Sequence, residues 1–282
     1  MSVSRRRFLQ AGGAAAALTG VRTLLADPLG LPVGTQTWPV RQLIKQDFPG
    51  TLKELSSAGY QTIEMCSPPG YKSMGFGGLA GMKGSEVRRM IEDSGLRCES
   101  CHFGFGEFKN SLDDRIAWAE GMGLKQMILS TFGVSDKATL DDWLHAVDIY
   151  NPIAERIQKA GFQAGYHNHD FEFKKYGDTL VYDELMKRFD PKLVKMQFQV
   201  AVISIGYHAE NFFNKYPGRF ISMHCNDWSP EQKKFVPIGK GVVDWKKVFT
   251  AAKTGGIKNY FVEVDTPEET MESAGYMHAL NV

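Results

Sequence analysis

The segment Gly59-Tyr-Gln-Thr-Ile-Glu-Met65 indicates the fold, because the same pattern returns four more times along the chain. Each copy follows an expected helix and combines a glycine, a large apolar residue, a short linking stretch and an expected strand. The glycine suits the left-handed residue that ends many helices. The other copies are Gly95-Leu-Arg-Cys-Glu-Ser-Cys101, Gly123-Leu-Lys-Gln-Met-Ile-Leu129, Gly161-Phe-Gln-Ala-Gly-Tyr166 and Gly256-Ile-Lys-Asn-Tyr-Phe-Val-Glu-Val264.

The spacing of these copies predicts eight helix–strand units. The first four glycines lie 36, 28 and 38 residues apart, and the fifth follows after 95 residues. That last gap has room for about three units of roughly 30 residues. Eight such units close into a barrel whose active site lies at the C-terminal ends of the strands. We therefore predict an α/β fold, a single (β/α)8 TIM barrel, with strands at 32–36, 62–65, 97–102, 126–130, 163–168, 194–200, 221–225 and 259–264.

The first 26 residues have the pattern of an export signal. Ser4-Arg-Arg-Arg-Phe-Leu9 precedes an Ala-rich apolar run that is too short to span a bilayer. The paired arginines before Phe-Leu resemble a twin-arginine signal. We expect residues 1–26 to be a signal segment, residues 27–282 to form the barrel domain, and the protein to be exported to the periplasm.

Composition narrows the possible partners. The formal net charge of the 282 residues is +1, and no basic stripe points to nucleic acid. No later apolar run is long enough for a membrane span. The sequence leaves the oligomeric state open, so an oligomer is possible. A Gly-rich stretch from Gly70 to Gly84 is expected to be a mobile loop over the barrel mouth.

Several expected strands end in residues that can bind metal or transfer protons. His167 and His169 are two positions apart, so on a strand both side chains point to one face. His224 ends the seventh expected strand and Glu263 lies near the end of the eighth. Imidazoles and a carboxylate that converge at one barrel mouth can hold a divalent metal.

The C-terminal half resembles the xylose-isomerase-like TIM barrels known as sugar phosphate isomerases/epimerases, especially their exported branch. The matching stretches are Gly165-Tyr-His-Asn-His-Asp-Phe-Glu-Phe173, Asp190-Pro-Lys-Leu-Val-Lys-Met196, Lys215-Tyr-Pro-Gly-Arg-Phe220, Ile238-Gly-Lys-Gly-Val-Val-Asp-Trp245 and Asn259-Tyr-Phe-Val-Glu263. The resemblance implies a Mn²⁺ or similar ion held at the ends of strands 5 to 8. It also implies that Glu64 and His102 contact the sugar or relay protons. Trp38 and Asn168 are further candidates for sugar contacts.

Two positions depart from the pattern of the family. Gln199 stands where relatives have an Asp, and His-Asn-His stands where many relatives have a Glu. The expected metal ligands, His169, Gln199, His224 and Glu263, therefore carry one formal negative charge instead of three. Such a set should hold a hard cation more weakly.

These observations favour a sugar or keto-sugar isomerase or epimerase that transfers a proton beside a carbonyl with the help of a metal. Glu263 is the expected base and metal ligand, and His167 or His169 the expected acid. The substrate is expected to be a small sugar, and export favours one without phosphate. The alternatives are a sugar-binding barrel without turnover, a lyase acting on oxidised (keto) glycosides, and a metal-dependent endonuclease on a related barrel.

Overall fold

The computed structural model describes residues 27–135 and 137–282. Eight parallel strands close into a barrel in the order β1-β12-β9-β8-β5-β4-β3-β2. Their bounds are β1 Gly34–Gln36, β2 Thr62–Cys66, β3 Arg97–Phe103, β4 Gln126–Leu129, β5 Gln163–His167, β8 Val194–Gln199, β9 Phe220–Cys225 and β12 Asn259–Val262. The (β/α)8 prediction is confirmed, with all eight strands within a few residues of the expected ranges. The predicted signal segment, residues 1–26, lies outside the described residues.

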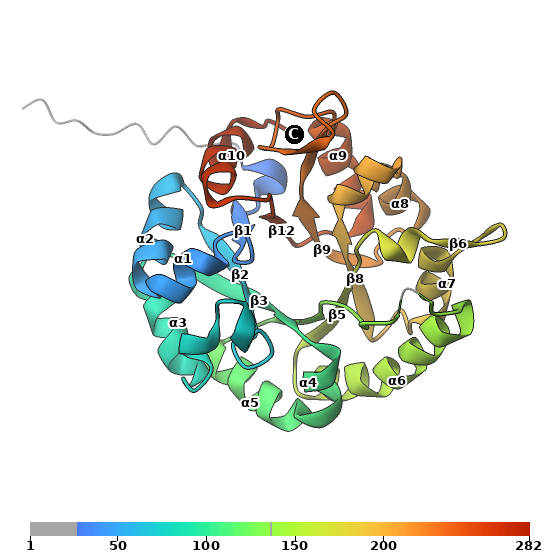
Figure 1. Cartoon of the computed structure of the whole chain (residues 1–282), viewed down its shortest axis with the longest axis horizontal. Helices are drawn as coiled ribbons and strands as arrows, with labels where there is room; N and C mark the ends of the chain where they lie inside the picture. Colours follow the sequence, from blue (N-terminus) through green and yellow to red (C-terminus); the bar gives the residue numbers. More distant parts are fainter. Residues whose placement is uncertain (1–26, 136) are drawn as a thin grey trace, which may run out of the picture.

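The helices form a ring around the strands (Figure 1). They are α1 Arg41–Gln46, α2 Phe48–Ala58, α3 Gly84–Asp93, α4 Phe105–Asn110, α5 Leu112–Met122, α6 Leu140–Lys159, α7 Val181–Arg188, α8 Ala209–Lys215, α9 Trp245–Gly255 and α10 Pro267–Ala279. In the part of the chain that the structure describes, each helix is too short or too polar to cross a membrane.

Local capping explains why helices and strands alternate where the sequence predicts it. Gly59 ends α2 with φ of 111° and Gly256 ends α9 with φ of 93°, a region that favours glycine. At the other end of α9, the side chain of Asp244 accepts a hydrogen bond from the Lys247 amide. These helix caps are formed by residues that are close in sequence, so the sequence pattern could predict them.

Two regions contain more regular secondary structure than the sequence suggests. The Gly-rich stretch contains two short 3-10 helices, Lys72–Met74 and Gly77–Leu79. It also places Tyr71 and Met74 at the barrel mouth, where both line a cavity. The final helix is weakly patterned in sequence, yet α10 extends over 13 residues.

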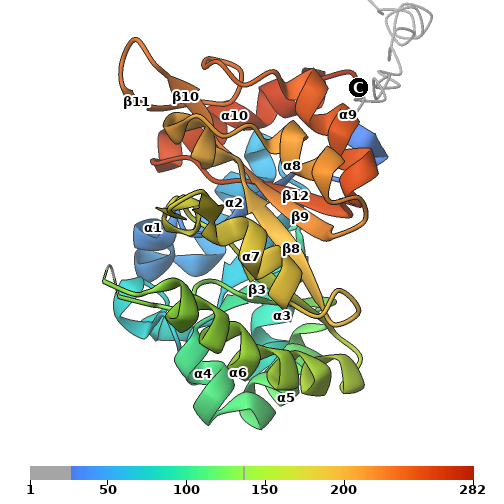
Figure 2. The same ribbon diagram turned by 90° about the vertical axis from the view of Figure 1, so that its right-hand side faces the viewer.

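A buried aspartate anchors the loop after β9. Asp227 is fully buried and accepts hydrogen bonds from the amides of Trp228, Gly239 and Val243 and from the Trp245 indole. It begins the hairpin formed by β10, Asp227–Ser229, and β11, Lys234–Val236, which projects beyond the helices (Figure 2). A second hairpin, β6 Lys175–Tyr176 with β7 Thr179–Leu180, follows β5. These loops build the rim around the strand ends.

Candidate active site

Strand register brings polar side chains together inside the barrel. Gln36 on β1 pairs with Glu64 on β2, which in turn pairs with Ser100 on β3. A shift in register after Ile63 skips Glu99, so Ser100 lies opposite Glu64. On the far side of the barrel, Gln197 on β8 pairs with Ser222 on β9.

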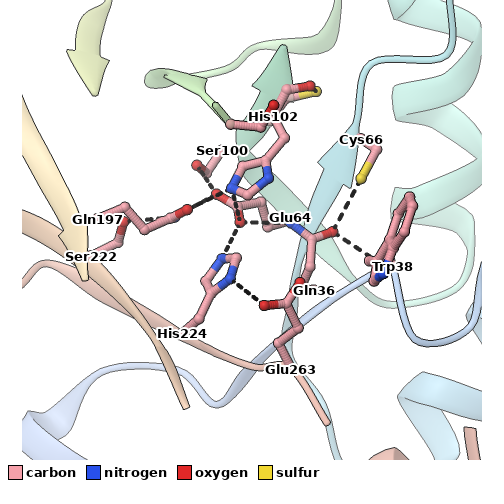
Figure 3. A network of polar contacts seen from close by, with 12 residues as sticks. Gln36, Trp38, Glu64, Cys66, Ser100, His102, Gln197, Ser222, His224 and Glu263 are labelled. Carbon is pink, nitrogen blue, oxygen red and sulfur yellow. Dashed lines mark hydrogen bonds and ion pairs between the residues drawn. The ribbon is translucent and has the colours of Figure 1, made fainter. Parts of the chain in front are cut away.

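Glu64 is the centre of this polar network (Figure 3). Its Oε1 accepts hydrogen bonds from Ser100 Oγ at 2.5 Å and Gln197 Nε2 at 2.8 Å. Its Oε2 accepts one from Gln36 Nε2 at 2.7 Å and lies 2.6 Å from His224 Nε2. The Glu64 side chain is fully buried, and burying a carboxylate is costly unless it is paired and hydrogen-bonded. The network supplies this compensation.

His224 joins two carboxylates. Its Nε2 contacts Glu64, and its Nδ1 lies 2.9 Å from Glu263 Oε2. Burial alone would lower the pKa of His224, but the charges of Glu263 and Glu64 and their hydrogen bonds raise it to about 10. For Glu64, burial alone would raise the pKa, because it disfavours the charged carboxylate. The charges of His102 and His224, together with hydrogen bonds, instead lower the pKa of Glu64 to about 2. The geometry therefore favours an imidazolium between two ionised carboxylates.

A cavity of about 380 Å³ opens at the C-terminal ends of the strands. Five of the residues singled out from the sequence line it, namely Trp38, His102, His167, His169 and Glu263. Glu263 is the single carboxylate among the described residues that line this cavity. The structure thus brings the proposed base and both proposed acids to one site.

The other candidate residues lie behind this lining. Glu64, Asn168 and His224 are fully buried and do not line the cavity. Asn168 Oδ1 accepts a hydrogen bond from the Gln199 amide, and Gln199 Nε2 donates to Glu263 Oε2 at 2.6 Å. Asn168 and Gln199 therefore position Glu263, and the sugar contacts expected of Glu64 and Asn168 remain predictions.

The cavity histidines differ from His224 in protonation. Burial, with repulsion from neighbouring histidines, lowers the pKa of His167 well below its usual value. Burial also lowers the pKa of His169 to about 4, although Glu263 acts in the opposite direction. Both are then neutral imidazoles at pH 7, suited to donating a hydrogen bond to an oxygen or to binding a metal.

One cluster of side-chain atoms in the site is close enough together to suit a metal ion. Ligand atoms of His102, His167 and His224 all lie within 4.8 Å of one another. In addition, Nδ1 of His167, Nδ1 of His169 and Oε1 of Gln199 are buried and have no hydrogen-bond partner among the residues that the structure describes. Imidazole nitrogens suit ions such as Zn²⁺, and an amide oxygen suits harder ions. The donors present therefore fit a divalent ion, and the set predicted from the sequence shares His224 with the three-histidine cluster.

Sequence reasoning missed part of the polar network and part of the cavity lining. Gln36, Ser100, Gln197 and Ser222 belong to the network, and Cys66, Tyr71, Met74, Ser130 and Thr131 belong to the lining. Gln197 and Gln199 are two positions apart on β8, so their side chains lie on the same face of a buried strand. This polar alternation is the one sequence feature that could have placed Gln197 inside the barrel.

Glu172 is a further missed residue, which fixes the loop after β5. Its Oε1 accepts a hydrogen bond from the Tyr166 hydroxyl, and its Oε2 accepts one from the His169 amide at 2.8 Å. Burial raises the pKa of Glu172 to about 7, although both hydrogen bonds lower it. Through the His169 amide, Glu172 holds the backbone that carries a cavity histidine.

The chain belongs to the xylose isomerase-like TIM barrel family, whose model matches residues 52–282. No curated protein sequence gives a significant match. The family assignment confirms the resemblance to xylose-isomerase-like TIM barrels, and membership of an exported branch stays a prediction.

Solved structures agree with this assignment. A sugar phosphate isomerase/epimerase from Parabacteroides distasonis is similar with a TM-score of 0.73 and 25% identity, over 89% of this chain and 94% of that chain. D-psicose 3-epimerase from Clostridium cellulolyticum, solved with D-tagatose, gives 0.64 at 12% identity, over 88% and 96%. The IolI protein with a bound zinc atom gives 0.65 at 12%, over 88% and 96%. The last two show the fold alone, whereas the first supports a sugar isomerase/epimerase role.

We predict that Glu64→Gln lowers the pKa of His224, because one of its two carboxylate partners becomes neutral. A histidine whose pKa rises from 6.5 to about 10 on folding stabilises the fold fully below pH 6.5. This contribution is lost as the pH rises through 10, and the loss should be smaller in Glu64→Gln. ¹⁵N NMR of the histidines and urea unfolding between pH 6 and 10 measure both effects.

The matched control is Glu172→Gln, a buried carboxylate that hydrogen-bonds Tyr166 and His169 instead of His224. His224 should titrate in this variant as in the parent. A parent His224 that titrates near 6.5 would contradict the charged network.

Proposed function

We propose that the protein is a sugar or keto-sugar isomerase or epimerase that transfers a proton at the carbon beside a carbonyl. One observation carries this proposal: Glu263 is the one described carboxylate in the cavity, and neutral histidines flank it. The pKa of Glu263 is lowered, because the charge and hydrogen bond of His224 outweigh the effect of burial. Glu263 is therefore ionised at neutral pH, as a base must be.

The residues of the site suggest separate roles in the proton transfer. Glu263 takes the α-proton to give an enediolate. Return of that proton to the neighbouring carbon, while the hydroxyl proton passes to the original carbonyl oxygen, gives the isomer. A proton delivered to the opposite face of the same carbon by His167 or His169 gives the epimer. Negative charge develops on the carbonyl oxygen as the proton leaves. His167 and His169, as neutral imidazoles, donate hydrogen bonds to that oxygen and stabilise the charge. Gln199 and His224 fix the carboxylate of Glu263 through their hydrogen bonds to Oε2.

A divalent metal fits the same site. His169, Gln199, His224 and Glu263 would hold it, with His102 and His167 as the nearest further imidazoles. When bound, the ion supplies a Lewis acid that polarises the carbonyl oxygen. Binding through His224 requires its imidazole to give up a proton, so metal and proton compete and metal affinity should rise with pH.

Nucleotide substrates are less suited to this cavity. None of the described residues that line it is Lys or Arg, so no cation there would pair with a phosphate. A neutral sugar fits the lining of aromatic, imidazole and hydroxyl groups better.

We predict that Glu263→Gln slows exchange of the α-proton of a ketose for deuterium by about 10²–10⁴-fold, because the variant lacks the base. Proton NMR of D-fructose, D-psicose and D-tagatose in D₂O measures this exchange. The control is Glu272→Gln, whose carboxylate pairs with Lys240 at the surface and which should exchange at the parent rate.

Other outcomes would favour the alternatives. Ketose binding without exchange in the parent would favour a non-catalytic sugar-binding barrel. Release of an aglycone with an unsaturated sugar, from an oxidised glycoside, would favour a lyase.

The neutral Gln199 makes the metal proposal testable. We predict that Gln199→Asp binds Mn²⁺ more tightly, because a carboxylate is a better ligand than an amide for a hard cation, and that Glu263→Ala abolishes binding. Calorimetric titration with Mn²⁺ and Zn²⁺ measures both. If Glu263→Ala binds as the parent does and His102→Ala does not, the three-histidine cluster is the site instead.

We also propose that residues 1–26 direct export by the twin-arginine route to the periplasm, on the basis of Ser4-Arg-Arg-Arg-Phe-Leu9. Replacing Arg5 and Arg6 together with Lys should leave the chain unprocessed in the cytoplasm, as judged by fractionation and mass spectrometry. Normal processing of that variant would reject this route.

A further inference from the structure

A second cavity lies beside the one that contains Glu263. It measures about 520 Å³, against about 380 Å³ for the inner cavity, and both are within the range of about 300–1,000 Å³ typical of ligand sites. Thr131 and His169 line both cavities, so the two cavities adjoin.

Aromatic rings form much of the wall of this outer cavity. Phe171 is 42% exposed although it is a large apolar residue. Its ring stacks on His169 with centroids 4.8 Å apart and on Trp143 with centroids 6.0 Å apart. These three rings all line the cavity, as does Val134. An exposed aromatic at the entrance to a reaction site offers a surface for a flat or ring-shaped group.

His169 supplies a polar group at the junction of the two cavities. Its Nδ1 is buried and has no hydrogen-bond partner within the described residues. A buried polar atom without a partner is costly, so a ligand that bonds to it gains affinity. An oxygen linking two rings would lie near this junction if one ring occupied each cavity.

We propose that the outer cavity is a second subsite, which binds a ring joined through an oxygen to the keto-sugar in the inner cavity. The substrate class is then a two-ring saccharide or glycoside instead of a free monosaccharide. This inference rests on the proposed function, since the inner cavity must hold the reacting sugar.

A phosphate group is the alternative to a ring as the ligand of the outer cavity. Phosphate sites use arginine forks or several backbone amides. Lys174 is the one cation among the described residues that line this cavity, and its ammonium lies 4.9 Å from the Tyr176 ring centroid. The Gly133 amide already donates to Thr131 Oγ1. The lining therefore favours a ring.

The test compares the affinities of the full chain for D-fructose, fructose 6-phosphate, and two disaccharides, turanose and isomaltulose, which carry glucose on fructose. Calorimetry should show a disaccharide binding at least about tenfold more tightly than fructose, the gain expected from one ring packed on aromatic groups. Ser135→Trp, an exposed change that fills the outer cavity, should reduce this preference to less than about twofold and leave fructose affinity unchanged.

Ser57→Trp is the matched control, because Ser57 is exposed on α2 away from both cavities. Phe171→Ala is a second variant, which should also weaken the disaccharide preference if Ser135→Trp folds poorly. Equal affinity for fructose and both disaccharides in the parent overturns this inference and leaves the proposed function standing. If the parent prefers fructose 6-phosphate and Lys174→Met removes that preference, the outer cavity binds a phosphate and not a ring. Absence of binding by all four sugars counts against the proposed function as well.

Discussion

The buried carboxylate of Glu64 is the constraint on which the rest of the barrel interior depends. An ionised group with no exposure must be paired and hydrogen-bonded, or the fold loses several kcal/mol. Partners for Glu64 come from β1, β3, β8 and β9, so its compensation requires these four strands to hold their relative register. Most barrels of this kind fill the interior with branched aliphatic side chains. Here polar side chains that hydrogen-bond to one another fill part of the barrel interior.

The network also sets the chemistry of the cavity above it. Because His224 contacts Glu64 on one side and Glu263 on the other, the same imidazole links a buried structural carboxylate to the proposed base. Gln199 holds the same oxygen of Glu263. The base is thus oriented by two donors before a substrate arrives, which is the pre-organisation that proton transfer requires.

The distribution of charge distinguishes this site from one rich in carboxylates. His167 and His169 are kept neutral by burial, whereas His224 is charged because its two partners are acids. The same residue type is therefore neutral at two positions and a cation at a third, within one site. Under the function that we propose, these imidazole groups would stabilise an enediolate, and a bound metal ion would add to that stabilisation.

The sequence by itself determined the barrel, because helix caps and alternating units depend on neighbours along the chain. Gly59, Gly256 and Asp244 carried that information, and the positions of His167, His169 and Glu263 near strand ends predicted one shared mouth. Only the tertiary structure decided which polar side chains meet. Ser100 faces Glu64 because of a skipped residue in the β2–β3 register, and Tyr71 and Thr131 reach the cavity from loops. The protonation of the histidines was also beyond the sequence, because burial and the nearest charges set each pKa, and both arise only when distant strands pack together.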